Sequence, residues 1–335
     1  MATTKANPFQ KATSVQKKIK LLLYGDWGTG KTVVGLSFPR VALIDTEGSA
    51  DLYGPGRQVH WGTVPEYDVL RTKSFEEILD ALDAIKADAG RNWQTLIIDP
   101  ATVVWQVLQD AGQLAAETRA SQRGNYDASN VALTQRDWGT IKRKLYRAMI
   151  DMVNLPVNVI LTAHLKDVTE QRGSGQNMTA VKVGEKPDAE KKTPYWFDVV
   201  VKMETRKDAQ GETTHGGVIE KDRSGLFRVG QWVPNLQYSH FAPILEAYSQ
   251  GETVVQQGED EAAERDAALL QDEAPRPKRT DIAAIRKLAA DKGISNAALT
   301  ETIGRDYGVE TLDELTEANA ALLKARLEKA QKKAA

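Results

Sequence analysis

The sequence predicts an α/β fold, with a mostly parallel sheet flanked by helices, followed by a small all-α domain. Nearly continuous apolar runs alternate with amphipathic segments, which is typical of parallel strands buried on both faces. An acidic, proline-containing segment at 249–278 then separates this core from a region of helical periodicity. The predicted parts are an N-terminal arm (1–17), the core (18–248), the acidic linker, and a helical domain (279–335).

The composition excludes several kinds of function. The 335 residues include 44 basic and 46 acidic side chains, so a basic surface over the whole chain is ruled out. With no cysteine, disulfides, thiolate zinc sites and cysteine nucleophiles are excluded, and the four histidines are scattered. No apolar run reaches the ~18 residues of a membrane span. We therefore expect a cytoplasmic protein without a membrane partner.

Six short apolar segments predict the strands of the core. The first, KIKLLLYG, runs directly into a glycine turn. The first four lack the polar alternation of a strand that faces water on one side, so we expect burial on both faces. The six segments are 18–25, 41–45, 95–99, 157–164, 197–205 and 215–221.

Three segments between these strands predict helices, at 74–90, 102–118 and 137–153. The first begins at Ser74, a suitable N-cap, and ends at Gly90. The third has one apolar face and a basic opposite face. The apolar face expected for the first helix consists of Phe75, Ile78, Leu79, Leu82 and Ile85.

Two stretches of the core lack periodicity and predict loops. The shorter covers residues 120–130, and the longer runs from 166 to 194. A structureless insertion as long as the second is usually functional or disordered. We expect the core to end near Tyr248, and we find no internal repeat.

The clearest motif is GDWGTGKT at 25–32, which matches G-x-x-x-x-G-K-[ST] and lies between a strand and a helix. The glycines let backbone N–H groups turn toward phosphates, with the partial positive charge of the helix start behind them. Lys31 would reach the β- and γ-phosphates, and the Thr32 hydroxyl would ligate Mg²⁺. The sequence therefore predicts a site for ATP and Mg²⁺, formed by Gly25, Asp26, Trp27, Gly28, Thr29, Gly30, Lys31, Thr32 and Val33.

Carboxylates follow two of the other predicted strands. Asp99 ends the strand 95–99, and the carboxyl ends of parallel strands form the ligand edge of such a sheet. Beside the phosphate loop, a role in holding magnesium is favoured for Asp99 over capping the next helix. Asp45 and Glu47 follow the strand 41–45, where a carboxylate would either activate the attacking water or cap turn amides.

Three short stretches resemble the RecA family. DTEGS is similar to the D-x-E that carries the catalytic glutamate after the second core strand, which implies that Glu47 is the general base. VILTAHLK is similar to the strand whose last polar residue, usually glutamine, senses the γ-phosphate; here that residue is His164. Lys221-x-Arg223 resembles the element of RadA- and DnaB-type proteins that enters the neighbouring subunit's nucleotide.

Residues 8–248 as a whole resemble the phage-encoded RecA-like ATPases of the Sak single-strand annealing group. The resembling stretches are KIKLLLYG with the phosphate loop, DTEGS, TLIIDP, and DWGTIKRKLYRAMIDMVNLPVNVILTAH. The resemblance implies a homo-oligomer, a ring or a filament, with nucleotide at its subunit interfaces. It also implies binding of single-stranded DNA and annealing or strand pairing in phage recombination, in the cytoplasm of a bacterial host.

The same resemblance implies contacts with DNA and with other proteins. Both predicted loops are DNA candidates, although plain solvated insertions would have the same composition. The helical domain is expected to dock a partner such as a single-strand-binding protein or another recombination protein. Phe9 and Ala12 resemble an F-x-x-A element that contacts the adjacent subunit, or they pack on their own domain. The expected DNA contacts are Arg119, Arg123, Tyr126, Lys166, Arg172 and Lys182.

Three other functions remain open from the sequence. A DnaB- or RadA-type translocase or helicase would share every nucleotide residue but would unwind DNA directionally. An ATP-gated annealing module would bind DNA with negligible hydrolysis. A small-molecule kinase is the third, and the long polar loop counts against it.

Overall fold

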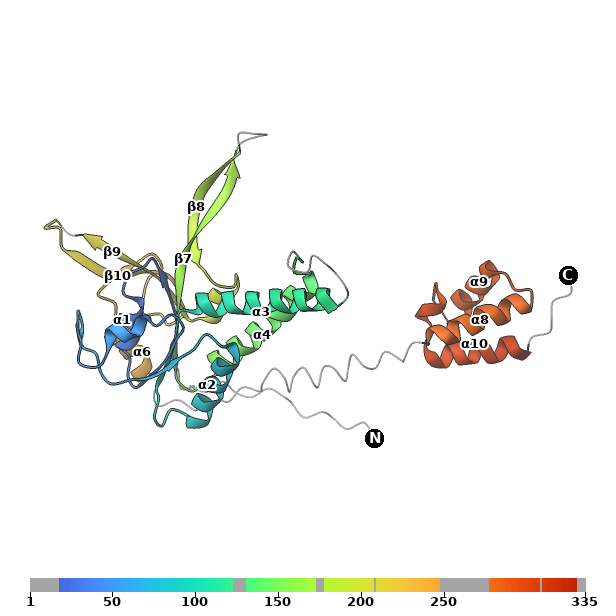
Figure 1. Cartoon of the computed structure of the whole chain (residues 1–335), viewed down its shortest axis with the longest axis horizontal. Helices are drawn as coiled ribbons and strands as arrows, with labels where there is room; N and C mark the ends of the chain where they lie inside the picture. Colours follow the sequence, from blue (N-terminus) through green and yellow to red (C-terminus); the bar gives the residue numbers. More distant parts are fainter. Residues whose placement is uncertain are drawn as a thin grey trace. The chain divides into compact units, whose positions relative to one another are not determined.

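The computed structural model describes residues 18–122, 131–172, 178–207, 209–247, 277–307 and 309–329. The chain divides into two compact units, 1–256 and 257–335 (Figure 1). The predicted arm 1–17 and residues 249–276 of the predicted linker lie outside the described residues. Among the described helices, none is long and apolar enough to cross a membrane.

The first unit is built on one large sheet. In the described residues its strand order is β11-β10-β9-β1-β7-β6-β2-β5, with β8 paired to β7. The six strands from β9 to β5 are parallel, whereas β10, β11 and β8 are antiparallel to their neighbours. The predicted α/β class is therefore confirmed. The strands are β1 (Lys20–Gly25), β2 (Val41–Asp45), β5 (Asp68–Arg71), β6 (Thr95–Asp99), β7 (Asn158–Arg172), β8 (Thr179–Pro187), β9 (Val199–Lys207), β10 (Thr213–Asp222) and β11 (Trp232–Pro234). A separate small hairpin pairs β3 (Gln58–Val59) with β4 (Gly62–Thr63).

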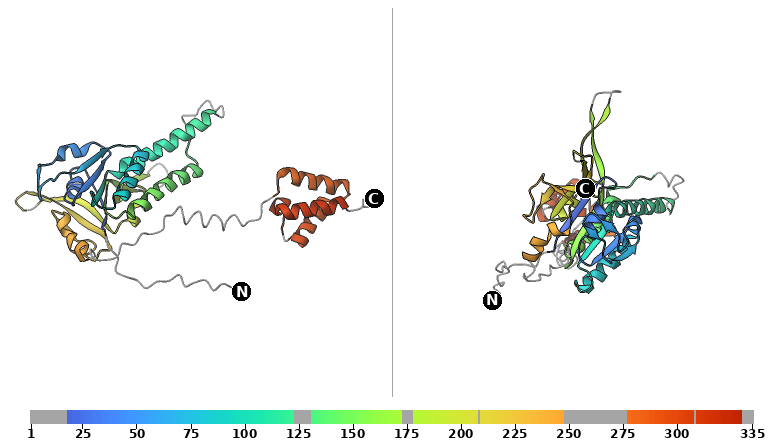
Figure 2. Two further views of the ribbon diagram at one scale, coloured as in Figure 1. Left: turned by 90° about the horizontal axis from the view of Figure 1, so that it is seen from below. Right: turned by 90° about the vertical axis from the view of Figure 1, so that its left-hand side faces the viewer.

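Helices cover both faces of this sheet. Successive residues of each central strand point to opposite sides, and because these residues are apolar, both faces must be buried. On β1, Leu22 and Tyr24 pack in the hydrophobic cluster under α2, α3 and α4, while Leu21 and Leu23 pack with α1 and α6. Figure 2 shows α3 and α4 leaving the sheet as a paired arm. The helices are α1 (Lys31–Leu36), α2 (Phe75–Asp88), α3 (Ala101–Gln122), α4 (Gln135–Val153), α5 (Thr193–Trp196) and α6 (Ala242–Ala247), with short 3-10 turns η1 (Ser49–Tyr53) and η4 (Tyr238–His240).

The predicted helices form close to their expected bounds. The Ser74 hydroxyl accepts a hydrogen bond from the backbone N–H of Glu77 at 3.4 Å, so Ser74 caps α2 as expected. Thr134 and Asp137 form a capping box at the start of α4. One part of the prediction for α2 is wrong: Leu79 is exposed, because it lies at the border of the apolar face rather than at its centre.

The predicted loop 166–194 is not structureless. β7 continues past His164, and β8 returns beside it with Leu165 opposite Pro187 and Arg172 opposite Thr179. Figure 1 shows this β7–β8 hairpin projecting beyond the rest of the sheet. Both of its faces are largely exposed, so its sequence lacks the continuous apolar run from which the buried strands were predicted.

The second unit is a small helical domain, as predicted. It consists of α8 (Arg279–Asp291), α9 (Asn296–Tyr307), the 3-10 turn η5 (Leu312–Glu314) and α10 (Glu317–Lys329). These elements share a core of aliphatic side chains that includes Ile285, Ile303 and Leu323. The apolar spacing seen in the sequence therefore corresponds to one buried cluster.

Candidate nucleotide site

The phosphate loop, residues 25–32, connects β1 to α1 at the carboxyl edge of the parallel strands. Gly30 has φ +90°, a left-handed conformation that strains any residue with a Cβ. Gly25 lies so close to β9 that an added Cβ would be 2.3 Å from the Met203 carbonyl oxygen. The conformation and packing of the loop therefore require the two outer glycines of the motif.

Lys31 lies against the loop itself. Its ammonium donates hydrogen bonds to the carbonyl oxygens of Gly25 at 3.0 Å and Asp26 at 2.8 Å. Burial lowers the pKa of Lys31, and the nearby carboxylates of Asp99, Asp26 and Glu47 oppose that shift. The ammonium is thus partly desolvated, which strengthens its attraction for a phosphate anion.

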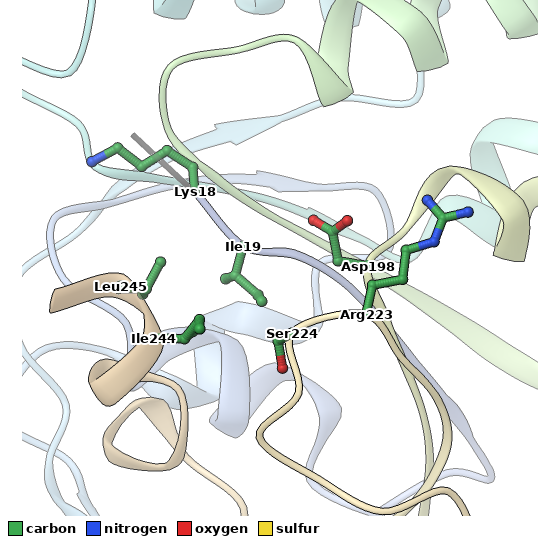
Figure 3. A pocket seen from close by; sticks show the side chains of 7 residues that line it. All are labelled: Lys18, Ile19, Asp198, Arg223, Ser224, Ile244 and Leu245. Carbon is green, nitrogen blue, oxygen red and sulfur yellow. The ribbon is translucent and has the colours of Figure 1, made fainter. Parts of the chain in front are cut away.

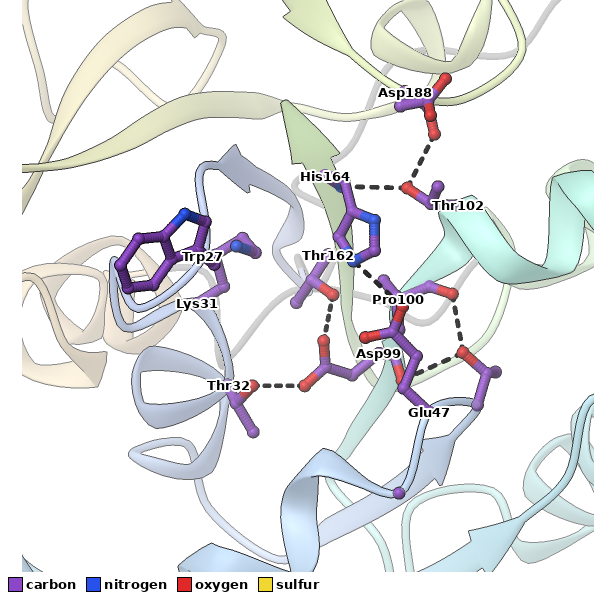
Figure 4. Close-up of polar contacts among 12 residues, drawn as sticks. Trp27, Lys31, Thr32, Glu47, Asp99, Pro100, Thr102, Thr162, His164 and Asp188 are labelled. Atoms are coloured by element: carbon purple, nitrogen blue, oxygen red, sulfur yellow. Dashed lines mark hydrogen bonds and ion pairs between the residues drawn. The ribbon is translucent and has the colours of Figure 1, made fainter. Parts of the chain in front are cut away.

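Asp99 joins the loop to the centre of the sheet. The Thr32 hydroxyl donates to Asp99 Oδ2 at 2.5 Å, and the Thr162 hydroxyl donates to Oδ1 (Figure 4). Burial raises the pKa of Asp99, and both hydroxyl contacts and the Lys31 charge partly offset this. Sequence reasoning missed Thr162, although it lies two positions before His164 and so on the same face of β7.

These residues fit a magnesium ion held partly by the nucleotide. The Thr32 hydroxyl and the Asp99 carboxylate are adjacent hard oxygen donors, the kind of ligand that Mg²⁺ prefers. Among the described residues there is no cluster of three or more His, Asp or Glu side chains that could hold a metal alone. A bound nucleotide would supply phosphate oxygens as further ligands of the same kind.

In the turn after β2, Asp45 and Glu47 have different surroundings, which distinguishes the two carboxylates between which the residues alone did not decide. Asp45 caps the turn: Oδ1 accepts from the backbone N–H groups of Glu47 at 3.1 Å and Gly48 at 2.8 Å, and Oδ2 from Ala50 at 3.1 Å. Glu47 instead extends toward β7, where its Oε1 lies 3.1 Å from Nε2 of His164. Of the pair, Glu47 alone is available to a ligand.

His164 is fixed by its backbone at the base of the β7–β8 hairpin. Its N–H donates to the Thr102 hydroxyl at 2.9 Å, and its carbonyl accepts from the Asp188 N–H at 2.8 Å. The Thr102 hydroxyl in turn donates to the Asp188 carbonyl at 2.7 Å. The contacts in Figure 4 therefore connect Glu47, through His164, to both α3 and the segment that follows β8.

A cavity of about 480 Å³ lies between the phosphate loop and η1. Its volume is within the usual range for small-ligand sites. Two apolar residues beside it face solvent, Trp27 at 89% and Leu52 at 69% exposure. The cavity is lined by Gly25, Asp26, Trp27, Gly28, Gly30, Lys31, Thr32, Glu47, Ser49, Leu52, Tyr53, Asp99, Pro100, His164 and Leu165.

Lys221 and Arg223 lie away from this cavity. Lys221 pairs with Val200 near the start of β9, whereas the phosphate loop follows the opposite end of β1. The Lys221 ammonium donates to three backbone carbonyls, those of Pro194, Tyr195 and Phe197, and burial lowers the pKa of Lys221.

Arg223 lines a separate cavity of about 60 Å³ beside Asp198 and the two residues that precede β1, Lys18 and Ile19 (Figure 3). Its backbone N–H donates to the Asp198 carbonyl at 2.9 Å. Neither basic residue lines the nucleotide cavity of its own chain. A role of this pair in a neighbouring subunit stays a prediction.

The described DNA candidates all have acidic partners. Arg119 pairs with Asp137, and Arg172 pairs with Glu170 at 3.4 Å. Lys166 pairs with Asp188 at 2.9 Å, and Lys182 contacts both Asp167 and Glu185 at 2.7 Å. The other two DNA candidates, Arg123 and Tyr126, lie outside the described residues, and so do Phe9 and Ala12, the predicted contacts with the adjacent subunit.

The fold and the site define a P-loop NTPase, an α/β domain with a glycine-rich phosphate loop between its first strand and first helix. The chain belongs to the AAA domain family, whose model matches residues 17–225. An AAA domain implies nucleoside-triphosphatase activity, and P-loop ATPases generally use ATP and Mg²⁺.

Other comparisons are more distant. The chain is similar to a solved structure described as the crystal structure of the RadB recombinase. The identity is 17%, over 70% of this chain and 90% of that chain, with a TM-score of 0.34. No curated protein matches the sequence significantly.

Proposed function

We propose that the chain is an ATPase that controls binding of single-stranded DNA through the contact between Glu47 and His164. This contact carries the proposal, because it joins a residue of the nucleotide cavity to the base of the β7–β8 hairpin. The proposed setting is phage recombination, where the protein would promote annealing or strand pairing as a homo-oligomer on DNA.

The residues around the cavity support a hydrolytic role. Lys31 and the loop amides would bind the β- and γ-phosphates, and Thr32 and Asp99 would hold Mg²⁺, which neutralises phosphate charge. Glu47 is partly exposed at the cavity, where its carboxylate can orient a water and accept its proton. Because Asp45 is occupied by turn amides, it leaves this task to Glu47.

The connection to the hairpin supports a switch. A γ-phosphate is an acceptor that would compete with Glu47 for the imidazole of His164. His164 is bonded through its backbone to Thr102 and Asp188, and the strand that contains it continues into the hairpin. A change in its position would therefore reach the hairpin without passing through a flexible loop.

DNA binding at the hairpin requires an exchange of partners. Lys166, Arg172 and Lys182 all pair with acids of the same chain, and their side chains are roughly half exposed or more. Exposed ion pairs contribute only ~0–1 kcal/mol each, so a polyanion can replace the acids at low cost.

Assembly would complete the site in this proposal. Lys221 and Arg223 lie too far from their own phosphate loop, and a neighbouring subunit could receive them. Lys221 would first have to release the three carbonyls that it now binds. A basic pair that enters in this way would stabilise charge on the transferred phosphoryl group.

Steady-state ATPase activity, measured with and without a 30-nucleotide oligo-dT, tests the proposal. Lys31→Ala should abolish turnover, and Glu47→Gln should lower kcat by about 10²–10⁴-fold while nucleotide still binds. Lys86→Ala and Glu76→Gln are matched controls, because both side chains are exposed on α2. Unchanged hydrolysis in Lys31→Ala would refute the site, and activity indifferent to DNA would refute the DNA-linked function.

A further inference from the structure

The arm formed by α3 and α4 presents a basic face that the proposed mechanism does not use. One side of α4 is buried against the core through Ile141, Leu145 and Met149. The opposite side is exposed, as the basic face in the sequence indicated. It is formed by Arg136, Gly139, Thr140, Arg143, Lys144 and Arg147.

The positive charge at Arg136, Arg143 and Lys144 is not compensated by any described acidic residue. None of these three side chains forms an ion pair with any other described residue. Asp137, the acidic residue at the start of α4, already has partners. Its carboxylate accepts hydrogen bonds from the Thr134 backbone N–H at 2.9 Å and from the Thr134 hydroxyl at 2.7 Å, and it forms an ion pair with Arg119. The face therefore differs from the hairpin, whose described basic candidates all have acidic partners.

We propose that this exposed face of α4 binds the phosphate backbone of single-stranded DNA, as a contact surface separate from the β7–β8 hairpin. The inference rests on the proposed DNA-binding function and deepens it. Arg136 and Arg143 lie two turns apart on the same side of the helix, about 10 Å at 1.5 Å per residue. A stacked strand carries a phosphate about every 3.4 Å, so this distance spans about three phosphates.

The shape of the face suits a nucleic-acid backbone. Gly139 and Thr140 separate the first two arginines, and a Cβ added at Gly139 would meet nothing within 4 Å. A chain of phosphates can thus lie close to the helix while the guanidinium groups contact it from both sides. Guanidinium groups also bind phosphate oxygens in pairs, which a lysine ammonium does not.

The same face is unsuited to an acidic protein partner. A protein interface usually has an apolar centre, and none of the exposed large hydrophobic residues of the described structure lies on α4. Interfaces with nucleic acid are more polar and more positively charged. The observations therefore favour DNA over an acidic polypeptide.

The salt dependence of DNA binding tests this inference. The double variant Arg136→Gln/Arg143→Gln would be compared with wild type by fluorescence anisotropy of labelled 30-nucleotide oligo-dT between 50 and 200 mM salt. Each lost phosphate contact should reduce the slope of log K against log salt by about 0.7, so we expect a reduction of about 1.4 and an affinity about tenfold lower. Thermal unfolding at the wild-type midpoint would show that the variant is folded.

Two control variants sharpen the comparison. Lys73→Gln/Lys86→Gln removes the same charge from other exposed positions and should keep the wild-type slope. Arg136→Lys/Arg143→Lys keeps the charges and should restore most of the slope. Both results support a contact located on α4 over a general effect of net charge.

Other outcomes would overturn the inference in different ways. If wild type binds the oligonucleotide and the glutamine variant keeps its slope, the α4 surface is wrong and the proposed function stands. If wild type does not bind DNA at all, the proposed function fails and this inference fails with it. If a 30-residue poly-glutamate binds wild type as tightly as the oligonucleotide does, and the glutamine variant loses that binding, the surface recognises acidic polypeptides and the inference is wrong.

Discussion

At the scale of single residues, Lys20 is an unusual feature outside the nucleotide site. It is buried at the start of β1, where its ammonium donates to the carbonyls of Leu155 at 2.9 Å and Val157 at 2.7 Å. Burial lowers the pKa of Lys20 to about 7 from 10.5. Between these values the unfolded chain binds more protons than the folded one, so this residue makes stability rise as pH rises.

Lys20→Met should therefore flatten the pH dependence of stability. In wild type, Lys20 should add up to about 1.4 kcal/mol per pH unit to the free energy of unfolding between pH 7 and 9. Urea denaturation at several pH values would measure this slope, with Lys18→Met as the control at a neighbouring position. An equal slope in wild type and Lys20→Met would show that the buried lysine does not titrate in this range.

The residues of the candidate site were partly predictable. The phosphate loop and Asp99 were expected from motifs at strand ends, and Glu47 and His164 from the resemblance to the RecA family; the structure places all of them around one cavity. The ends of parallel strands meet at one edge, which is why these separate stretches of sequence come together. Thr162 was not predicted, because a threonine within a buried strand has no motif of its own.

At the scale of elements, apolar content decided which strands could be predicted. The buried strands have continuous apolar sequences and were predicted; they are β1, β2, β6 and the first part of β7. β5 was missed, since it lies at the sheet edge and is mostly exposed, and β8 was missed for the same reason. Both strands are defined by backbone hydrogen bonds to a neighbouring strand, and such bonds leave little trace in the polarity of the side chains.

Shortening the β7–β8 hairpin should separate hydrolysis from DNA binding. Asp167 and Glu185 are paired in the ladder, so residues 168–184 can be replaced by a two-residue Asn-Gly turn. His164 and Asp188 stay in place, so we expect hydrolysis without DNA to persist and its stimulation by oligo-dT to be lost. Full stimulation in the shortened protein would exclude the hairpin as the DNA-responsive element.

At the scale of the whole molecule, the position of the site explains how it could act at a distance. The phosphate loop leaves β1, Asp99 ends β6, and β7 lies between these two strands. Of these three strands, β7 continues past the site into the β7–β8 hairpin, so it connects the nucleotide site to that hairpin directly. The central claim is that the nucleotide state travels along this strand through His164.

Hydrogen exchange of backbone amides tests that claim most directly. Wild type and His164→Ala would each be measured with and without Mg²⁺ and a non-hydrolysable ATP analogue. The phosphate loop should gain protection in both proteins, which shows that the nucleotide is bound. The account predicts that exchange in the β7–β8 hairpin, residues 165–187, changes with nucleotide in wild type and does not change in His164→Ala. A protected loop beside a hairpin that exchanges identically with and without nucleotide in wild type would contradict it.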